Sequence, residues 1–367
     1  MIPVNEPLFG SREKELLIQC IDTGWVSSEG PFVKQFEESF SSYIGVKHGI
    51  AVCNGTAAIE TALYAAGIEK GDEVIMPTFT IISCAIAVIR LGAIPVLVDI
   101  EPDTWNMDVT QIESKITKST RAVMPVHIYG HPVDMDPVME IAEKYNLTVI
   151  EDAAEVHGAE YKGEKAGSIG HIAIFSFYAN KIINTGEGGM VVTNNKVMAE
   201  RARSYRNLCF KTSRRFYHTE MGYNFRMTNL QAAIGMAQIE RIEESVSFKR
   251  EMGDYYRKKL SEIPGIRFPL EKPWAKTVYW MYSIEIDESV GIQAGEMIEK
   301  LRSHEIGSRP FFLGLHEQPV FHDMGLFVGE RYSIAERASR YGLYLPSGMT
   351  LTKSQVDFVC DTLKTLI

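Results

Sequence analysis

The chain has 367 residues, of which 45% are hydrophobic and 23% are charged, and its formal net charge is −9. This length predicts two lobes that share a hydrophobic core, and the acidic balance argues against nucleic acid or an anionic membrane surface as the main partner. The five cysteines are scattered and form no CxxC pair, which favours reduced thiols over a disulfide framework or a zinc site. The first residues show no signal peptide pattern, and the apolar run at 81–89 is too short to span a bilayer, so we expect a cytoplasmic protein without a membrane segment.

The N-terminal part is expected to form two helices, over 11–23 and 32–44. A strand over 49–53, a turn at 54–56 and a third helix over 57–66 are expected to follow. Gly55 and Thr56 would place free backbone N–H groups and a hydroxyl at the start of the third helix, where a phosphate can bind. Capping of the helix by Asn54 or Thr56 accounts for the same residues, so this turn alone leaves both interpretations open.

Short apolar strands then alternate with helical patterns along the chain. The expected strands are 73–76, 94–100, 122–129 and 148–151, and the expected helices between them are 80–91, 109–116 and 137–145. This alternation predicts βαβ units and a mostly parallel sheet with both faces covered. Ligands of such sheets bind at the carboxyl ends of the strands.

Two of these strand ends carry side chains capable of chemistry. His127 and His131 belong to one of them, but Gly130 and Pro132 argue against the helix that would bring the two histidines together as metal ligands. We therefore expect a packed or sugar-contacting loop there, and no metal. At the other strand end, Asp152 is an expensive residue to bury unless it meets a cation. An ordinary salt bridge or helix cap would also explain an acid at this strand end, for Glu151 especially.

A lone lysine, Lys181, follows the next expected strand, residues 172–177, and a Gly-rich bend at 185–189 separates it from a further strand at 190–193. Burial would lower the pKa of this amine toward its neutral form, which suits a Schiff base. The glycines let the backbone approach a bound group closely. A solvent-facing loop lysine is the alternative interpretation of this stretch.

Together these parts match the needs of pyridoxal 5′-phosphate (PLP). Gly55 and Thr56 offer a phosphate turn, and Ser176 is placed to reach the same phosphate. Lys181 would form the imine, and Asp152 would keep the pyridine nitrogen protonated so that the ring accepts electrons. The order of the parts and their positions in the predicted sheet favour a PLP site more strongly than any one of them does.

The remainder of the chain predicts a second, smaller unit. A long helix over 230–260 is expected to lead into it. A strand over 278–286 and two helices, over 294–304 and 353–366, are expected to follow. We therefore divide the chain into a large PLP-binding domain with the N-terminal segment, residues 1–240, and a small C-terminal α+β domain, residues 241–367.

At this point the sequence resembles the DegT/DnrJ/EryC1/StrS family of PLP-dependent sugar aminotransferases over nearly its whole length. The motifs that carry the resemblance are Asn54–Ala58, Pro77–Thr80, Glu151–Glu155, Ser176–Phe177 with Asn180–Lys181, Thr185–Gly189 and Gly222–Asn229. The resemblance implies the α/β architecture of fold type I aminotransferases, with a large domain whose mostly parallel mixed sheet is flanked by helices. It also implies a homodimer with each active site built at the subunit interface.

The resemblance further implies roles for individual residues. Lys181 would hold the cofactor and shuttle the proton, Asp152 would partner the pyridinium nitrogen, and Glu155 would lie near the ring hydroxyl. Asn224 would be donated by the neighbouring subunit, with Arg226 nearby. The residues of the phosphate cradle would be Gly55, Thr56, Ala57 and Ser176.

Within the family, the sequence is most similar to enzymes that aminate C4 of GDP-4-keto-6-deoxymannose to GDP-perosamine with glutamate as donor. This likeness rests on residues 127–132, 224–229 and 308–316, and it makes Arg309 and His316 candidate sugar or nucleotide contacts. It implies a place in the biosynthesis of O-antigen or another surface polysaccharide.

Several alternatives stay open at the level of the sequence. Ile81 stands where many relatives stack an aromatic ring on the cofactor, which leaves cofactor affinity and substrate preference undecided. A 3- or 4-aminotransferase acting on a UDP- or dTDP-linked ketosugar is the first alternative. A PLP-dependent ketosugar dehydratase is disfavoured because such enzymes carry histidine at the position of Lys181. A non-catalytic PLP-binding regulator is disfavoured by the intact set of Lys181, Asp152 and Ser176.

Overall fold

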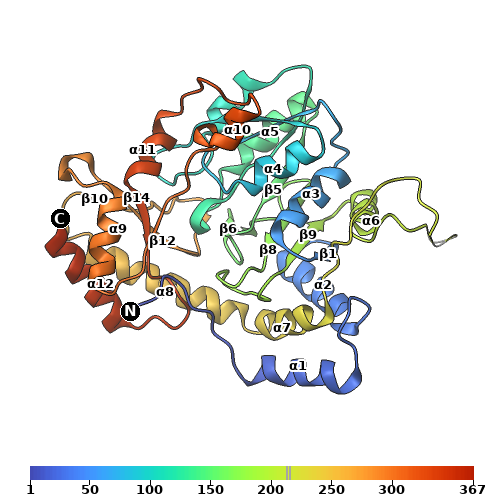
Figure 1. The fold of residues 1–367 in the computed structure, drawn as a ribbon, viewed down its shortest axis with the longest axis horizontal. Helices are drawn as coiled ribbons and strands as arrows, with labels where there is room; N and C mark the ends of the chain where they lie inside the picture. The colour runs from blue at the N-terminus through green and yellow to red at the C-terminus, as the bar shows by residue number, and fades with distance from the viewer. Residues whose placement is uncertain (212–213, 215) are drawn as a thin grey trace.

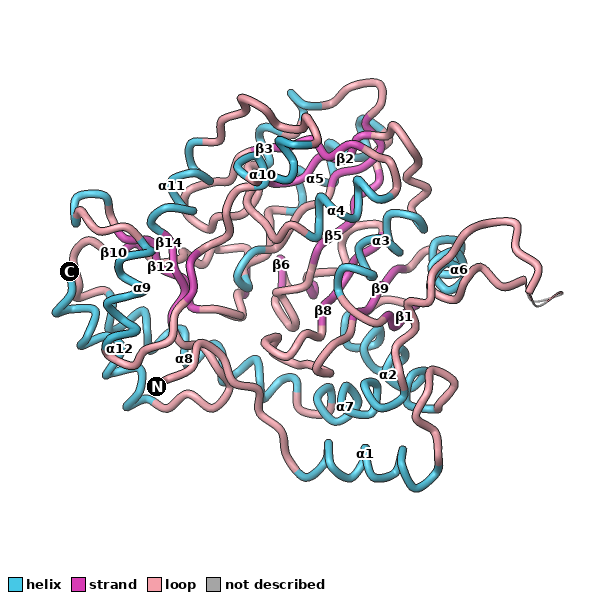
Figure 2. The backbone as a smooth tube through the Cα atoms, in the orientation of Figure 1, coloured by secondary structure: helices cyan, strands magenta, loops and turns pink. Residues whose placement is uncertain are grey.

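A computed structural model of the chain describes residues 1–211, 214 and 216–367. A seven-stranded sheet with the order β1-β9-β8-β5-β4-β2-β3 forms its centre (Figures 1 and 2). Neighbouring strands run parallel from β8 to β3, whereas β9 pairs antiparallel with both β8 and β1. The strands are β1 (His48–Val52), β2 (Glu73–Pro77), β3 (Ile94–Val98), β4 (Thr120–Val123), β5 (Thr148–Asp152), β8 (Ile172–Ser176) and β9 (Gly189–Thr193). The predicted α/β class with a mostly parallel mixed sheet is confirmed.

Helices cover both faces of this sheet, because successive residues of each strand point to opposite sides. In β2, Val74 and Met76 join the core beneath α3 (Gly55–Ala65) and α4 (Ser83–Arg90), whereas Ile75 joins a separate core beneath α5 (Met135–Tyr145). The other helices on the large domain are α1 (Ser11–Thr23) and α2 (Pro31–Ile44), which pack on α7 (Asn229–Ile239), and α6 (Lys196–Tyr205), which packs on α3.

The smaller domain is built on a four-stranded antiparallel sheet with the order β10-β12-β14-β13. Its strands are β10 (Ile266–Arg267), β12 (Tyr282–Ile286), β13 (Arg309–Pro310) and β14 (Gly342–Leu345), and its helices are α8 (Ile242–Leu260), α9 (Ala294–Ser303) and α12 (Lys353–Leu366). Apolar side chains of these helices and strands form one core. A third sheet of three short strands comprises β6 (Glu160–Tyr161), β7 (Glu164–Lys165) and β11 (Ala275–Lys276).

Two segments connect the domains in ways that a boundary at residue 240 does not describe. The first residues lie on the smaller domain, where Gly307 N donates to Ile2 O and Ser347 N donates to Val4 O; Figure 1 shows both termini on that side of the molecule. The segment with α10 (Pro319–Asp323) and α11 (Ser333–Tyr341) returns to the large sheet. There, Tyr332 Oη donates to Leu97 O at 3.0 Å.

Three sequence predictions of secondary structure were wrong. The expected helix over 109–116 is two 3-10 turns, Val109–Gln111 and Glu113–Lys115. The expected strand over 122–129 is observed only as Thr120–Val123, and a turn at Ile128–Gly130, with Tyr129 at a φ of +52°, occupies its expected end. The expected helix over 230–260 is divided into α7 and α8 at Arg241, whose φ of −122° and ψ of 20° are not helical. Within the described residues, no helix combines the length and the apolar character needed to cross a membrane.

Candidate active site

A cavity of ≈ 530 Å³ lies at the carboxyl ends of the parallel strands. Loops that follow β1, β2, β5 and β8 supply one part of its wall, and the smaller domain and the segment that precedes α10 supply the other. Its lining includes Asn54, Gly55, Thr56, Thr80, Ile81, Ser83, Asp152, Glu155, Ser176, Lys181, Trp280, Phe312 and Tyr344. The sheet topology therefore brings together the strand-end residues that the sequence predicted as a site.

Lys181 is enclosed in this cavity and does not face solvent. Its side chain is 9% exposed, with Nζ 3.6 Å from Glu155 Oε1. The same nitrogen lies 3.7 Å from the centre of the Trp280 indole ring. Burial lowers the pKa of the amine, while the nearby carboxyl groups of Glu155 and Asp152 oppose that shift. The amine can therefore exchange a proton more readily than a surface lysine can.

Asp152 stands at the end of β5 with its carboxyl group buried. It accepts hydrogen bonds from Cys84 Sγ at 3.2 Å and from Ala154 N at 3.1 Å. Burial raises its pKa. The sequence did not predict Cys84 as a site residue. It lies in the apolar helix α4, and no local pattern shows that its side chain contacts the end of β5.

Glu155 is held beside the lysine by an unusual backbone turn. Its Oε2 accepts a hydrogen bond from Tyr129 N at 2.8 Å, and Tyr129 has the left-handed φ of +52°. Burial raises the pKa of Glu155 to about 7, although Lys181 acts to lower it. A carboxyl group that titrates near neutrality therefore lies next to the amine. Tyr129 was not foreseen, because a positive φ on a tyrosine has no sequence signature.

The start of α3 forms a narrow cradle against β8. Asn54 caps the helix by accepting from Ala57 N at 2.8 Å, and Thr56 Oγ1 donates to Ser83 Oγ at 3.0 Å. A Cβ atom on Gly55 would lie only 2.9 Å from Ser176 Cβ, so glycine is required for this approach. Asn54 caps the helix, while Gly55, Thr56 and Ser176 line the cavity, so the two interpretations are compatible and the phosphate role stays a prediction. Ala57 is not in the lining.

Four other predicted residues do not line this cavity, namely Asn224, Arg226, Arg309 and His316. Asn224 is exposed and pairs through its backbone with Asn207, and Arg226 donates to the side chain of Asn207. Arg309 lines a second cavity of ≈ 460 Å³ together with Tyr178, Asn180 and Tyr344, which also belong to the first. The roles predicted for these residues stay predictions.

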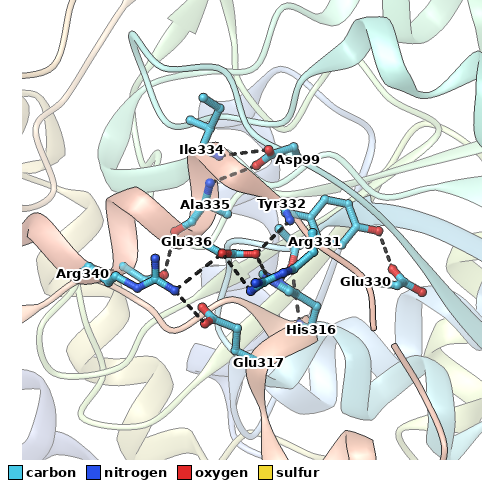
Figure 3. Close-up of polar contacts among 12 residues, drawn as sticks. Asp99, His316, Glu317, Glu330, Arg331, Tyr332, Ile334, Ala335, Glu336 and Arg340 are labelled. Atoms are coloured by element: carbon cyan, nitrogen blue, oxygen red, sulfur yellow. Dashed lines mark hydrogen bonds and ion pairs between the residues drawn. The ribbon is translucent and has the colours of Figure 1, made fainter. Parts of the chain in front are cut away.

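His316 is buried in a polar network that includes Glu336 (Figure 3). Its Nδ1 lies 2.7 Å from Thr78 Oγ1, and its Nε2 lies 3.4 Å from Glu336 Oε1. Arg331 and Arg340 also pair with Glu336. Both ring nitrogens are thus engaged within the protein, and a substrate contact of His316 stays a prediction.

The two histidines near residue 130 are packed residues in this structure. His127 Nε2 lies 3.0 Å from Glu151 Oε2, and burial lowers the pKa of His131 to about 4. Glu151 thus has a buried polar partner in His127, as an ordinary structural role for this acid predicts. Across the described residues, no group of His, Cys, Asp and Glu side chains is arranged to hold a metal ion.

The arrangement defines the class of protein. A buried amine, a buried carboxyl group at a strand end and a glycine cradle at a helix N-terminus fit the aldehyde, the ring nitrogen and the phosphate of PLP. These are the features of a PLP-dependent aminotransferase. When bound, PLP supplies the electron sink for chemistry at the substrate carbon.

Comparisons with known proteins agree with this class. The model of the DegT/DnrJ/EryC1/StrS aminotransferase family matches residues 7–364, and the chain belongs to that family. GDP-perosamine synthase of Caulobacter vibrioides is 42% identical over 99% of this chain and 97% of the relative. The structure of DesI in the presence of its TDP-sugar product is 31% identical, with a TM-score of 0.90 over 100% of this chain and 92% of DesI.

A further solved structure bears on the cofactor. The PLP form of the putative sugar aminotransferase Spr1654 from Streptococcus pneumoniae has a TM-score of 0.93, with 25% identity over 100% of this chain and 98% of that one. The predictions of a PLP-dependent sugar aminotransferase and of the fold type I architecture are confirmed.

Proposed function

We propose that this protein transfers the amino group of L-glutamate to the C4 keto group of GDP-4-keto-6-deoxymannose, giving GDP-perosamine and 2-oxoglutarate. The observation that carries transamination is the enclosed amine of Lys181, 3.6 Å from Glu155 Oε1 in a cavity that also holds Asp152. The likeness to the Caulobacter enzyme supports the GDP-linked sugar as the acceptor.

Each residue of the cavity has a separate role in the proposed reaction. Lys181 Nζ takes a proton from the substrate carbon and returns it at another atom, as a general base and then a general acid. Asp152 is placed to keep a proton on the ring nitrogen of the cofactor, and Glu155 holds a proton beside the amine. Gly55, Thr56 and Ser176, which line the cavity, are proposed to bind the phosphate through backbone N–H groups and hydroxyls, with Ala57 beside them at the start of α3.

We place the reacting sugar ring of the substrate in the first cavity. The nucleotide part then needs further space. We place its nucleotide part toward the second cavity, which shares Tyr178, Asn180 and Tyr344 with the first. Arg309, at the edge of that cavity, is suited to the diphosphate, because a guanidinium group pairs well with phosphate oxygens. Ile81, which is half-exposed in the lining, is proposed to supply apolar contact to the cofactor ring.

The proposal includes a homodimer in the cytoplasm. Asn224 and Arg226 lie outside the lining of their own cavity, which supports a role in the site of the partner subunit. The five cysteines are free, as expected of reduced thiols. The product fits the biosynthesis of O-antigen or another surface polysaccharide.

Absorbance spectroscopy of the purified protein tests the proposal. The visible band of bound PLP should bleach on addition of L-glutamate and return on addition of GDP-4-keto-6-deoxymannose. Bleaching without return would reject that acceptor. UDP- and dTDP-linked ketosugars are then tested in its place, an alternative favoured by the likeness to DesI, whose structure contains a TDP-sugar product. A band that glutamate leaves unchanged would favour a non-catalytic regulator instead.

A further inference from the structure

The middle of α8 carries a lysine that is buried without a carboxylate partner. Lys249 is 1% exposed. Its Nζ donates to Trp280 O at 2.8 Å and also donates to Ser347 O. Neither of these acceptors is charged, and the described residues offer Lys249 no ion pair.

Such a residue is costly to bury. Removing an ammonium group from water is unfavourable unless hydrogen bonds or an opposite charge offset the loss. Burial lowers the pKa of Lys249 to about 7, so the side chain exists in both charged and neutral forms at neutral pH. An apolar residue of similar length would fill the same space without that cost, so the two hydrogen bonds are the feature that a lysine adds.

Both acceptors belong to segments that lead directly to the active site. The Trp280 ring lies 3.7 Å from Lys181 Nζ, and its Nε1 donates to Asn180 O at 2.8 Å. Ser347 N donates to Val4 O at 2.7 Å. The next residue, Asn5, donates through Nδ2 to the same Asn180 O at 3.1 Å. Two routes from Lys249 therefore converge on the residue that precedes the catalytic lysine.

The remaining contacts of Trp280 hold its indole ring, whereas Lys249 holds its backbone carbonyl. Its ring is stacked near Tyr129, with centroids 6.3 Å apart and an interplanar angle of 15°. That contact and the hydrogen bond from Nε1 to Asn180 O position the indole ring. The hydrogen bond from Lys249 fixes the backbone from which the ring projects.

We infer that Lys249 is a positioning residue of this aminotransferase, which ties the backbones of Trp280 and Ser347 to α8 and thereby fixes the indole wall against which Lys181 lies. Lys249 lines neither of the two cavities and acts through Trp280. The inference rests on the sugar aminotransferase activity but not on the identity of the nucleotide.

A double-mutant cycle tests whether Lys249 acts through Trp280. Lys249→Met keeps the length of the side chain and removes its hydrogen-bond donors, and kcat should fall about tenfold or more, since small displacements of reacting groups are costly. In a Trp280→Phe background the same change should lower kcat by less than about twofold, because coupled residues give non-additive effects. Lys258→Met, an exposed lysine on the same helix, should leave kcat unchanged.

A second measurement does not require the cofactor or any activity. The fluorescence of Trp280 in the PLP-free protein is obtained by subtracting the signal of the matching Trp280→Phe protein. Its quenching by acrylamide should increase when Lys249 is replaced. If Lys249→Met does not fold, Lys249→Gln, which keeps a shorter donor, replaces it in both experiments. Equal losses of kcat in both backgrounds, with unchanged quenching, would show that Lys249 only stabilises the domain and would overturn the inference.

Discussion

At the scale of single residues, the central pair of the site is held in forms that exchange protons easily. Burial lowers the pKa of Lys181 and raises that of Glu155 to about 7. Asp152 is buried as well, and its pKa is also raised. The enclosure that makes these groups costly in the free protein is the same enclosure that excludes water from the reaction.

Glu155 gives the PLP-free protein a stability that depends on pH. Its folded-state pKa of about 7 lies above the ordinary value of 4.5, so the folded chain binds the extra proton between those values. The stabilising contribution of Glu155 should be complete below pH 4.5 and should be lost as the pH rises through about 7. Glu155→Gln cannot ionise, so it should be more stable than the original protein above neutrality, by up to about 3 kcal/mol.

Urea unfolding of the PLP-free proteins between pH 5 and pH 8 measures this difference. Glu164→Gln, an exposed carboxylate in β7, is the matched control and should show no such trend. A constant difference between Glu155→Gln and the original protein over that range would contradict the assigned pKa.

At the scale of elements, the approach of α3 to β8 forms the phosphate cradle. Gly55→Ala would place a Cβ atom 2.9 Å from Ser176 Cβ, and the two elements would have to separate. We expect PLP to bind about tenfold more weakly and the free energy of unfolding to fall by about 1–3 kcal/mol. Titration of the PLP-free protein with PLP, followed by absorbance, measures the affinity. Gly295→Ala in α9, where a Cβ atom meets open space, should change neither quantity appreciably.

The attachment of α11 to the large sheet is a second element-scale feature (Figure 3). Asp99, just after β3, accepts from Ile334 N at 3.1 Å and from Ala335 N at 3.0 Å. These N–H groups belong to the first turn of α11 and have no helical acceptors. Asp99→Ala should therefore lower the free energy of unfolding by about 2 kcal/mol. Asp108→Ala, which removes a partly exposed cap on a 3-10 turn, should cost under about 1 kcal/mol in the same urea experiment.

The sequence predicted the parts of the site that follow strands. Lys181, Asp152 and Ser176 were identifiable because each ends or follows an apolar strand, and parallel topology gathers such ends at one edge. Trp280 and Cys84 were not, because they reach the site from a different domain and from a helix. Their roles depend on distances between elements, which no local pattern encodes.

The errors in secondary structure have a similar origin. The division between α7 and α8 has no glycine or proline to mark it, and the helical pattern continues through it. Arg241 leaves the helical conformation where its side chain donates to Leu8 O and, at 2.8 Å, to Glu13 Oε1. A tertiary contact with the N-terminal segment accompanies this break, and a single-sequence pattern cannot show it.

At the scale of the whole molecule, the position of Asn224 bears on how the sites are assembled. Asn224 is exposed and lies outside the lining of its own cavity, whereas Lys181 is enclosed in it. If two subunits share their sites, the Asn224 of one subunit serves the Lys181 of the other. A dimer in which one subunit has Lys181 replaced and the other has Asn224 replaced then keeps one complete site.

Subunit mixing tests this arrangement. Lys181→Ala should be inactive, and Asn224→Ala should be strongly impaired, each as a homodimer. After the two are unfolded together in equal amounts and refolded, half of the dimers should be mixed, and each mixed dimer has one site with both Lys181 and Asn224 intact. Activity should therefore recover to about a quarter of that of the unaltered protein, because one site in four is complete. Were Asn224 to serve its own subunit, every site in the mixture would carry one defect, and the activity would stay near the mean of the two variants.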